Sequence, residues 1–159
     1  MSRILGLDLG ARRIGVAVAD SGGIAMPLTT LRRGGTVAAD AAAIARLLSE
    51  QGASEIVVGL PLEAAGQEGP QARITRDWVE AVQPLLSAEA PVRYRDERLS
   101  SHLAEDRLGP MKRGRSGGPP SRTQRDAWRA RVDREAAAII LQDELDARAA
   151  DSRQTETSR

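Results

Sequence analysis

Two short apolar segments near the N-terminus most constrain what this chain can form. Residues 4–9 and 14–19 are mostly apolar, the turn between them begins with Gly10, and Gly15 follows at the start of the second run. Apolar runs of this length around a glycine-bearing turn predict two adjacent strands joined as a hairpin. The first run resembles a strand buried on both faces, yet it contains Asp8. A carboxylate at that depth costs several kcal/mol unless it meets a cation, hydrogen-bond donors or water.

Two interpretations of Asp8 stay open at this point. Its side chain either accepts hydrogen bonds from amides of the following turn, or it is a metal ligand on a rigid strand. The rest of the chain has to decide between them.

The remaining pattern predicts an α/β fold. Residues 24–31 form a third strand, with Pro27 at an edge position because proline cannot donate to a ladder. Apolar residues at helical spacing and breaker residues predict helices at 36–51, 71–86 and 125–150, a short helix ending at Leu108, and strands at 55–60 and 91–97. The two later strands follow helices and should run parallel to the first. We therefore expect a mixed sheet, an antiparallel three-strand meander plus two parallel strands, with helices on both faces.

Length and composition bound the class of protein. With 159 residues, 41% of them hydrophobic, we expect one domain over residues 1–150 and a disordered polar tail over residues 151–159. No apolar run is long enough for a membrane span, and the N-terminus lacks a signal-peptide pattern. The absence of cysteine excludes disulfides and thiolate metal sites and suits a cytoplasmic protein.

The basic residues are concentrated in one part of the chain. Between Lys112 and Arg134 there are eight basic residues and two acidic ones. Residues 109–124 also hold seven glycines and prolines, which predicts a mobile basic loop. The chain has only two tryptophans, one tyrosine and no phenylalanine, too few rings to stack successive unpaired bases. We expect any nucleic acid to be held by its backbone and shape.

Three acids are candidates for chemistry because of their positions. Asp8 interrupts a buried strand, Glu97 lies at the end of the last strand, and Asp133 precedes apolar residues three, four and seven positions along the final helix. That spacing turns Asp133 toward the sheet. Three inward carboxylates repel one another unless cations lie between them, and Mg²⁺ or Mn²⁺ favours such oxygen ligands. Two ions roughly 4 Å apart can activate water and stabilise the leaving oxygen of a phosphodiester.

Ordinary ion pairs are the alternative to a metal site. Glu97 could pair with Arg93 or Arg98, and Asp133 could pair with Arg129. Spacing alone does not choose between these pairs and bound ions.

Four segments together resemble the YqgF/RuvX family. They are, in the family's order, GLDLGARRIGVAVAD, IVVGLPLEAAGQEGPQA, YRDERLSSHLAEDRL and VDREAAAIILQDELD, and the similarity as a whole runs over residues 4–146. These ribonuclease-H-like bacterial proteins are described as pre-16S rRNA nucleases and Holliday-junction resolvase homologues. The resemblance implies a ribonuclease-H-like mixed five-stranded sheet, a divalent-ion site and phosphodiester cleavage. The family's acidic triad falls on Asp8, Glu97 and Asp133, which would be both the catalytic residues and the metal ligands.

The resemblance also implies a mechanism and a substrate. Water activated by two divalent ions, Mg²⁺ or Mn²⁺, would attack phosphorus in line. The first expectation is an endonuclease that processes the 5′ end of precursor 16S rRNA in ribosome biogenesis, with the ribosome as a further partner. A Holliday-junction resolvase acting on four-way DNA junctions is the alternative, and would favour a homodimer over a monomer. A non-catalytic nucleic-acid-binding module is the third possibility. A strand–turn–strand unit like the one at residues 4–19 also begins the sugar-kinase-like ATPases. Those ATPases, however, are built from two such domains.

Six basic residues are candidates for binding nucleic acid: Arg12, Arg13, Arg98, Lys112, Arg113 and Arg115. Arg12 and Arg13 could equally be solvated turn residues, and Arg98 could instead orient Glu97.

Two departures from the family pattern stand near the expected site. Ala11 replaces the usual Thr or Ser, and Glu63-Ala64-Ala65 replaces the usual Asn-Met-Asp.

Overall fold

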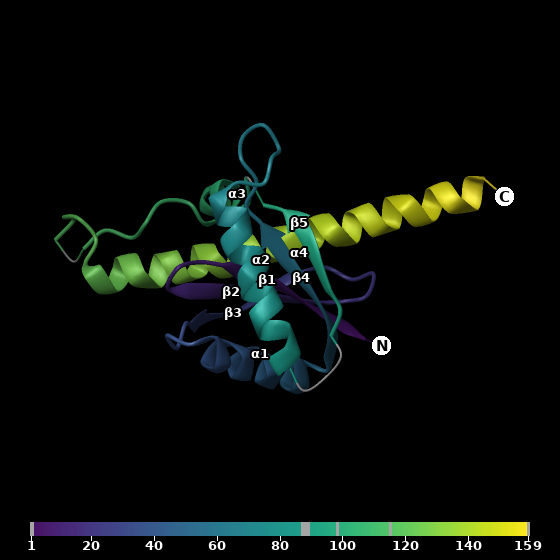
Figure 1. Ribbon diagram of the computed structural model, residues 1–159. Helices are drawn as coiled ribbons and strands as arrows, with labels where there is room; N and C mark the ends of the chain where they lie inside the picture. Colours follow the sequence, from purple (N-terminus) through teal and green to yellow (C-terminus); the bar gives the residue numbers. More distant parts are fainter. Residues whose placement is uncertain (1, 87–89, 98, 115, 159) are drawn as a thin grey trace.

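A five-stranded sheet forms the centre of the computed structural model, which describes residues 2–86, 90–97, 99–114 and 116–158 (Figure 1). The strands are β1 (Arg3–Leu9), β2 (Arg13–Asp20), β3 (Met26–Arg32), β4 (Ala53–Leu60) and β5 (Val92–Asp96). Their order is β3-β2-β1-β4-β5, with β1, β2 and β3 antiparallel and β4 and β5 parallel to β1. The expected meander followed by two parallel strands is confirmed, and β3, the strand containing Pro27, lies at an edge.

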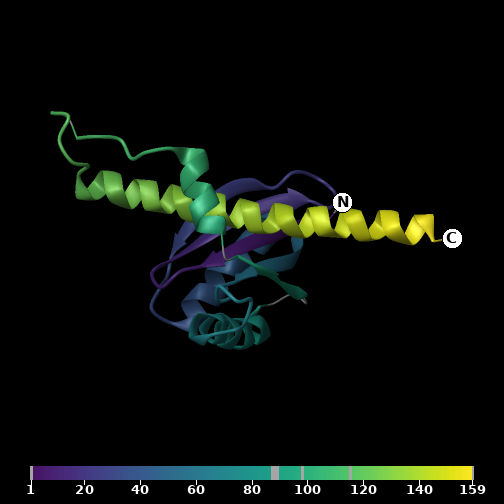
Figure 2. The ribbon, with the colours of Figure 1, turned by 90° about the horizontal axis from the view of Figure 1, so that it is seen from above.

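Helices cover both faces of this sheet. They are α1 (Val37–Gln51), α2 (Pro70–Val82), the 3-10 helix η1 (Gln83–Leu85), α3 (Ser100–Leu108) and α4 (Arg122–Thr157). Figure 2 shows α4 lying across one face, with α1 and α2 on the other. α3 packs against α4 through a small apolar cluster.

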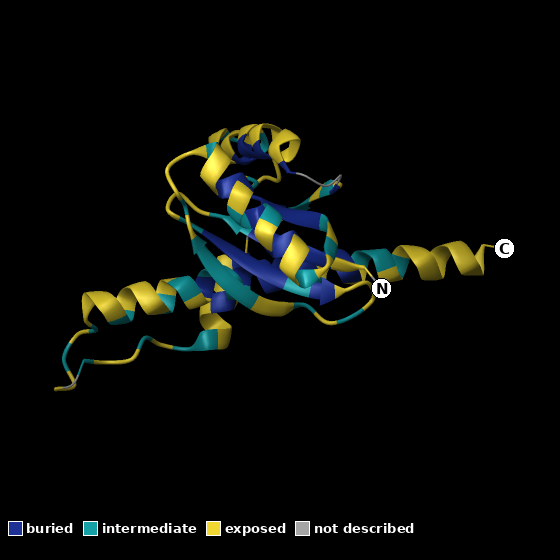
Figure 3. Ribbon diagram, turned by 90° about the horizontal axis from the view of Figure 1, so that it is seen from below, coloured by how far each residue is buried: buried dark blue, intermediate teal, exposed yellow. Residues whose placement is uncertain are grey.

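The two faces follow from the alternation of side chains along each strand. Leu5 and Leu7 of β1 are buried against α1 and α2. Ile4, Gly6 and Asp8 alternate with them and therefore face α4, where Ile4 belongs to the apolar cluster beneath that helix. Figure 3 shows the central strands buried between the helix layers.

Glycines bring α4 unusually close to the sheet. A Cβ on Gly6 would lie 2.8 Å from Leu141 Cβ, and one on Gly15 would lie 1.9 Å from the backbone oxygen of Asp133. The absence of a side chain at these two strand positions lets the helix backbone approach β1 and β2 directly. Asp133 is thereby held beside the end of the β1–β2 hairpin.

Helix α4 is longer than the sequence pattern predicted at both ends. It begins at Arg122 because Ser121 and Gln124 form a reciprocal capping box. It continues through Thr157, where we expected a polar tail from residue 151. These last turns are exposed and extend beyond the sheet (Figures 1 and 2). No helix of the described chain is long and apolar enough to cross a membrane.

The connection between α3 and α4 is a long excursion. Residues 109–114 and 116–121 form neither helix nor strand and run alongside the first turns of α4 (Figure 1). Trp128 Nε1 donates to Gly109 O at 3.3 Å, and Gln124 Nε2 donates to Arg113 O at 3.1 Å. These bonds tie the connection to the helix that follows it.

Candidate active site

Asp8 lies near the end of β1 on the face covered by α4. Its partner in the antiparallel register is Gly15 of β2, so no side chain stands between Asp8 and the helix on that side. Burial raises the pKa of the Asp8 carboxyl, and the negative charge of Asp133 raises it further, while a hydrogen bond from Glu97 acts in the opposite direction. Asp8 is only partly buried, and no salt bridge joins its carboxyl group to a cation of the described residues.

Glu97 reaches the same place from the far edge of the sheet. It directly follows β5, and its backbone N–H donates to Leu60 O of β4 at 3.2 Å. Its side chain passes over Gly59, where a Cβ would lie 2.6 Å from Glu97 Oε2. Gly59 thus leaves the space through which Glu97 crosses β4 toward Asp8 of β1.

The Asp8 and Glu97 carboxyl groups share a hydrogen bond, which requires that one of them carries the proton. Burial raises the pKa of Glu97 to about 10, and the charge of Asp8, the hydrogen bond to Asp8 and the charge of Asp96 add to the shift. Protonated Glu97 therefore donates to the Asp8 carboxylate. The Oε2 atom of Glu97 is buried and has no hydrogen-bond partner among the described residues.

Asp133 comes from α4 and lies on the same side of the sheet. Its Oδ2 accepts a hydrogen bond from Arg13 Nε at 2.7 Å, and both side chains are about a quarter exposed, at 24% and 28%. Its charge is close enough to raise the pKa of Asp8. The alternative pairing with Arg129 is not found among the described residues, because Arg13 of β2 supplies the cation instead.

The structure brings the three predicted acids to one place, but with different partners. Asp8 and Glu97 are in direct contact, whereas Asp133 turns to Arg13. Within the described residues, no three acidic or histidine side chains lie close enough together to hold a metal ion as they stand. The donor set nonetheless suits a hard divalent cation, because it offers carboxylate oxygens and one buried acceptor, Glu97 Oε2, without a partner in the described part of the chain.

The predicted basic residues have several placements. Arg13 contacts Asp133, so it is not a solvated turn residue, whereas Arg12 is exposed on the β1–β2 turn. Lys112 and Arg113 are exposed on the excursion before α4. Two further candidates, Arg98 and Arg115, lie outside the described residues. Arg93, the other proposed partner of Glu97, instead pairs with Glu55 at 3.6 Å.

Both departures from the family pattern lie near the carboxylates. Ala11 is exposed on the β1–β2 turn and lines a cleft together with Arg12 and Arg13. Ala64, in the loop after β4, lines a separate cavity of about 700 Å³ that also includes Glu97.

Sequence reasoning missed a group of arginines beside the acids. Arg32, Arg33 and Arg122 join Arg12 and Arg13 around a cleft of about 740 Å³ between β3, the start of α1 and the start of α4. The signal that could have found them is the Arg32-Arg33-Gly34-Gly35 sequence at the end of the edge strand. The sequence around Arg122 does not predict its place in the cleft, because only the path of α4 brings Arg122 to the other arginines.

Comparison with known proteins shows the family of this chain. The RuvX family model, described as Holliday junction resolvase, matches residues 2–147. The chain belongs to the RuvX family. A relative from Chloroflexus aurantiacus is 44% identical over 146 residues, covering 91% of this chain and 87% of the relative. One from Anaeromyxobacter dehalogenans is 46% identical, covering 92% and 98%. Both are provisionally named pre-16S rRNA nuclease.

Solved structures agree on the fold of this RuvX-family chain. Thermus thermophilus RuvC, solved in complex with a Holliday junction substrate, superposes with a TM-score of 0.53 at 17% identity, covering 94% of this chain and 96% of that one. The fowlpox virus Holliday junction resolvase gives 0.50 at 11% identity, covering 91% and 99%. The ribonuclease-H-like mixed sheet expected from the sequence is confirmed.

Proposed function

We propose that this protein is a metal-dependent endonuclease that hydrolyses phosphodiester bonds of structured nucleic acid, with precursor 16S rRNA as its substrate. The proposed cut is at the 5′ end, during ribosome biogenesis, which would place the protein in the bacterial cytoplasm with the ribosome as a partner. The names of relatives that match nearly the whole chain support this substrate.

One observation supports the chemistry most strongly: the contact between Asp8 and Glu97. Two carboxyl groups at this depth cannot both be ionised unless a cation joins them. Without a cation the pair keeps a proton, and Glu97 Oε2 stays buried without a partner. A site of this kind favours replacement of the proton by a divalent ion, which would also satisfy the free oxygen.

Asp8 and Glu97 would hold Mg²⁺ or Mn²⁺, and Asp133 would complete the set for two ions. When bound, such ions polarise the phosphoryl oxygen and lower the pKa of water. The chain's own residues then orient the substrate. Asp8 and Glu97 fix the position of the reacting centre on rigid strands, and Arg13 lies where it can donate to a phosphate oxygen.

The basic residues around this centre would bind the backbone of the nucleic acid. Arg12, Lys112 and Arg113 are exposed and close in sequence to the elements that carry the acids. We extend the same role to Arg98 and Arg115. Binding of this kind releases counterions, so affinity should fall steeply with rising salt.

A four-way DNA junction is the second candidate substrate. The observation that favours it is the description of the family whose model matches this chain. Cutting two strands of a junction would require two sites, and hence a homodimer, whereas processing one rRNA end needs only a monomer.

Cleavage assays with a matched variant test the proposal. The wild-type protein is incubated with precursor 16S rRNA leader and with a four-way DNA junction, each with Mg²⁺, Mn²⁺ or a chelator. Asp8→Asn is the test variant, and Asp77→Asn, an exposed α2 residue paired with Arg73, is the control. We expect cleavage that needs the metal, persists in Asp77→Asn and disappears in Asp8→Asn. Equal cleavage by both variants, or none by the wild type, would overturn the proposal.

A further inference from the structure

The arginine cleft is the most strongly charged hollow beside the acids. Five guanidinium groups line its cavity of about 740 Å³, against a single carboxylate, Asp126. The arginines come from three separate parts of the chain: Arg12 and Arg13 from the start of β2, Arg32 and Arg33 from the end of β3, and Arg122 from the start of α4. Only the folded chain brings these positive charges together.

Two of these arginines are held in place. Arg13 Nε donates to Asp133, and Arg33 Nε donates to Asp40 Oδ2 at 3.0 Å. Arg33 Nη1 also donates to Gly10 O at 3.2 Å, which ties it to the β1–β2 turn. The side chains of the other three make no hydrogen bond or ion pair with the described part of the chain. Their charges are free to meet an anion from solution.

Asp40 is built into the fold as the support for Arg33. It is 3% exposed, although it lies in the first turn of α1. Its carboxylate accepts from Trp78 Nε1 at 3.0 Å and from the Gly34 backbone N–H at 3.3 Å, in addition to Arg33. A buried carboxylate with three donors fixes the guanidinium that it binds, so Arg33 enters the cleft with a set position.

The cleft adjoins the acidic site through Arg13, which lines the cleft and also donates a hydrogen bond to Asp133. On the other side of Glu97 lies the cavity of about 700 Å³, which is lined by Asp96, Asp143 and the apolar Leu99 and Leu103. Negative charge repels phosphate from that second cavity. Of the two cavities, the arginine cleft therefore offers the more favourable electrostatic environment for backbone phosphates.

We propose that the arginine cleft binds consecutive backbone phosphates of the substrate strand next to the cleavage site, with Arg32 and Arg122 as contacts and Asp40 as the positioning residue for Arg33. The ligand is a polynucleotide backbone rather than bases, because no aromatic residue lines the cleft. This inference rests on the proposed function only in taking nucleic acid as the substrate.

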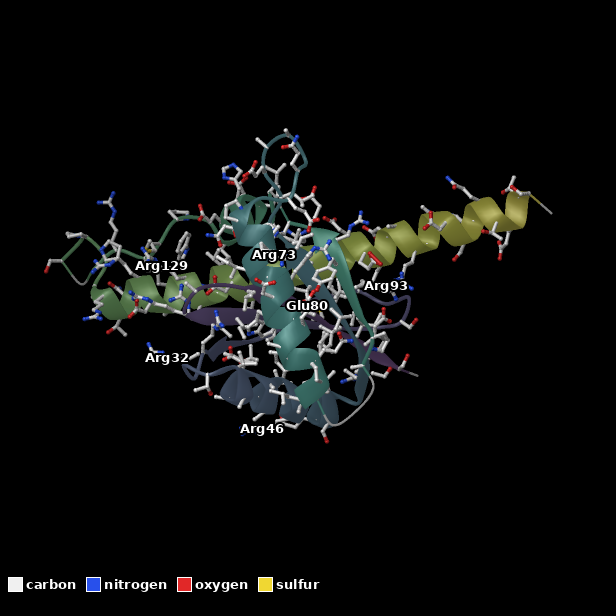
Figure 4. The ribbon with its side chains drawn as sticks, viewed as in Figure 1. Arg32, Arg46, Arg73, Glu80, Arg93 and Arg129 are labelled. Carbon is white, nitrogen blue, oxygen red and sulfur yellow. The ribbon has the colours of Figure 1, made fainter. Side chains whose placement is uncertain are left out.

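The test is a binding measurement without metal, so that cleavage plays no part. The affinity of the full chain for precursor 16S rRNA leader and for a four-way DNA junction is measured in chelator over a series of salt concentrations. The test variant is Arg32→Gln/Arg122→Gln. The control is Arg46→Gln/Arg153→Gln, which removes the same charge from exposed positions on the outer side of α1 and on the last turns of α4 (Figure 4 labels Arg32 and Arg46).

The cleft variant should bind nucleic acid at least about tenfold more weakly than the wild type. The slope of its plot of log affinity against log salt should be smaller in magnitude by about 1.5 to 2. The control variant should change affinity by less than about twofold. Equal losses in both variants, no loss in the cleft variant, or no binding by the wild type would overturn the inference. Cleavage is measured in parallel with metal. A cleft-specific loss of binding without any metal-dependent cleavage would leave the cleft assigned and reject the nuclease proposal.

Discussion

Asp133 Oδ2 accepts a hydrogen bond of 2.7 Å from Arg13 Nε, and this contact joins the acidic site to the arginine cleft. The two residues are 120 positions apart in the sequence. They meet because Gly15 lets the backbone of α4 touch β2 just beyond Arg13. Arg13 neutralises one of three neighbouring carboxylates in the metal-free protein and also faces the space where a phosphate would bind.

Replacing Arg13 should therefore have opposite effects on two ligands. In Arg13→Gln, Asp133 loses its cation, so Mn²⁺ should bind about fivefold more tightly, the equivalent of about 1 kcal/mol for a partly exposed ion pair. Nucleic acid should bind about tenfold more weakly, since one phosphate contact is lost. Metal titration and nucleic-acid binding measure the two effects, with Arg46→Gln as the control. A parallel loss or parallel gain of both affinities would contradict the double role.

The stability of the metal-free protein should fall as pH rises. The pKa of Glu97 is about 10 in the folded protein, against about 4.3 in an unfolded chain. At a pH between these two pKa values, Glu97 keeps its proton in the folded state but has released it in the unfolded state. Stability is therefore greatest at the acidic end and decreases by up to about 1.4 kcal/mol per pH unit. Melting temperatures between about pH 6 and about pH 9 measure the slope.

Glu97→Gln removes the titrating proton and keeps a donor for Asp8, so its slope should be flatter than that of the wild type. Glu50→Gln, on the exposed side of α1, is the control and should keep the wild-type slope. If the slopes of all three proteins coincide, Glu97 does not hold the proton.

The close approach of α4 to β2 should be sensitive to one methyl group. In Gly15→Ala the new Cβ would lie 1.9 Å from Asp133 O, so the helix must move and carry Asp133 with it. We expect a loss of about 1–3 kcal/mol in unfolding free energy, together with weaker metal binding. Gly118→Ala is the control, because nothing lies within 4 Å of its added Cβ. Wild-type stability in Gly15→Ala would contradict the described packing.

Asp40 should matter for stability and for binding. Asp40→Asn loses the charge that holds Arg33 and leaves buried donors poorly paired, which should cost about 2 kcal/mol in unfolding free energy. Asp77→Asn, with its exposed ion pair to Arg73, should cost less than about 0.5 kcal/mol. Chemical denaturation measures both. Equal losses would show that the buried network contributes no more than a surface pair.

Much of this architecture could be predicted from local pattern. Two apolar runs around a glycine turn defined the hairpin, and helices followed by short apolar strands defined the parallel half of the sheet. Asp8 could be singled out because a carboxylate is unusual in an apolar strand, although the strand pattern alone left its role open between a turn contact and a metal ligand. The helical spacing after Asp133 correctly turned that residue toward the sheet.

What local pattern could not predict depends on contacts between distant elements. In the short helix α3, for example, Ala104 packs against α4 while the larger Leu103 is 45% exposed. The helix expected to start at residue 125 starts at Arg122, since Ser121 and Gln124 cap each other. The arginine cleft and the support that Asp40 gives Arg33 arise only when β3, α1 and α4 meet.

The central claim is that Asp8, Glu97 and Asp133 hold divalent ions, and direct Mn²⁺ binding tests it. Free Mn²⁺ is measured by electron paramagnetic resonance during titration of the wild type, Asp8→Asn and Asp77→Asn, and proton release is followed in weak buffer. We expect two ions per chain, release of the proton shared by Asp8 and Glu97, and an affinity at least about tenfold lower in Asp8→Asn. Unchanged binding in Asp8→Asn, or no proton release on binding, would contradict it.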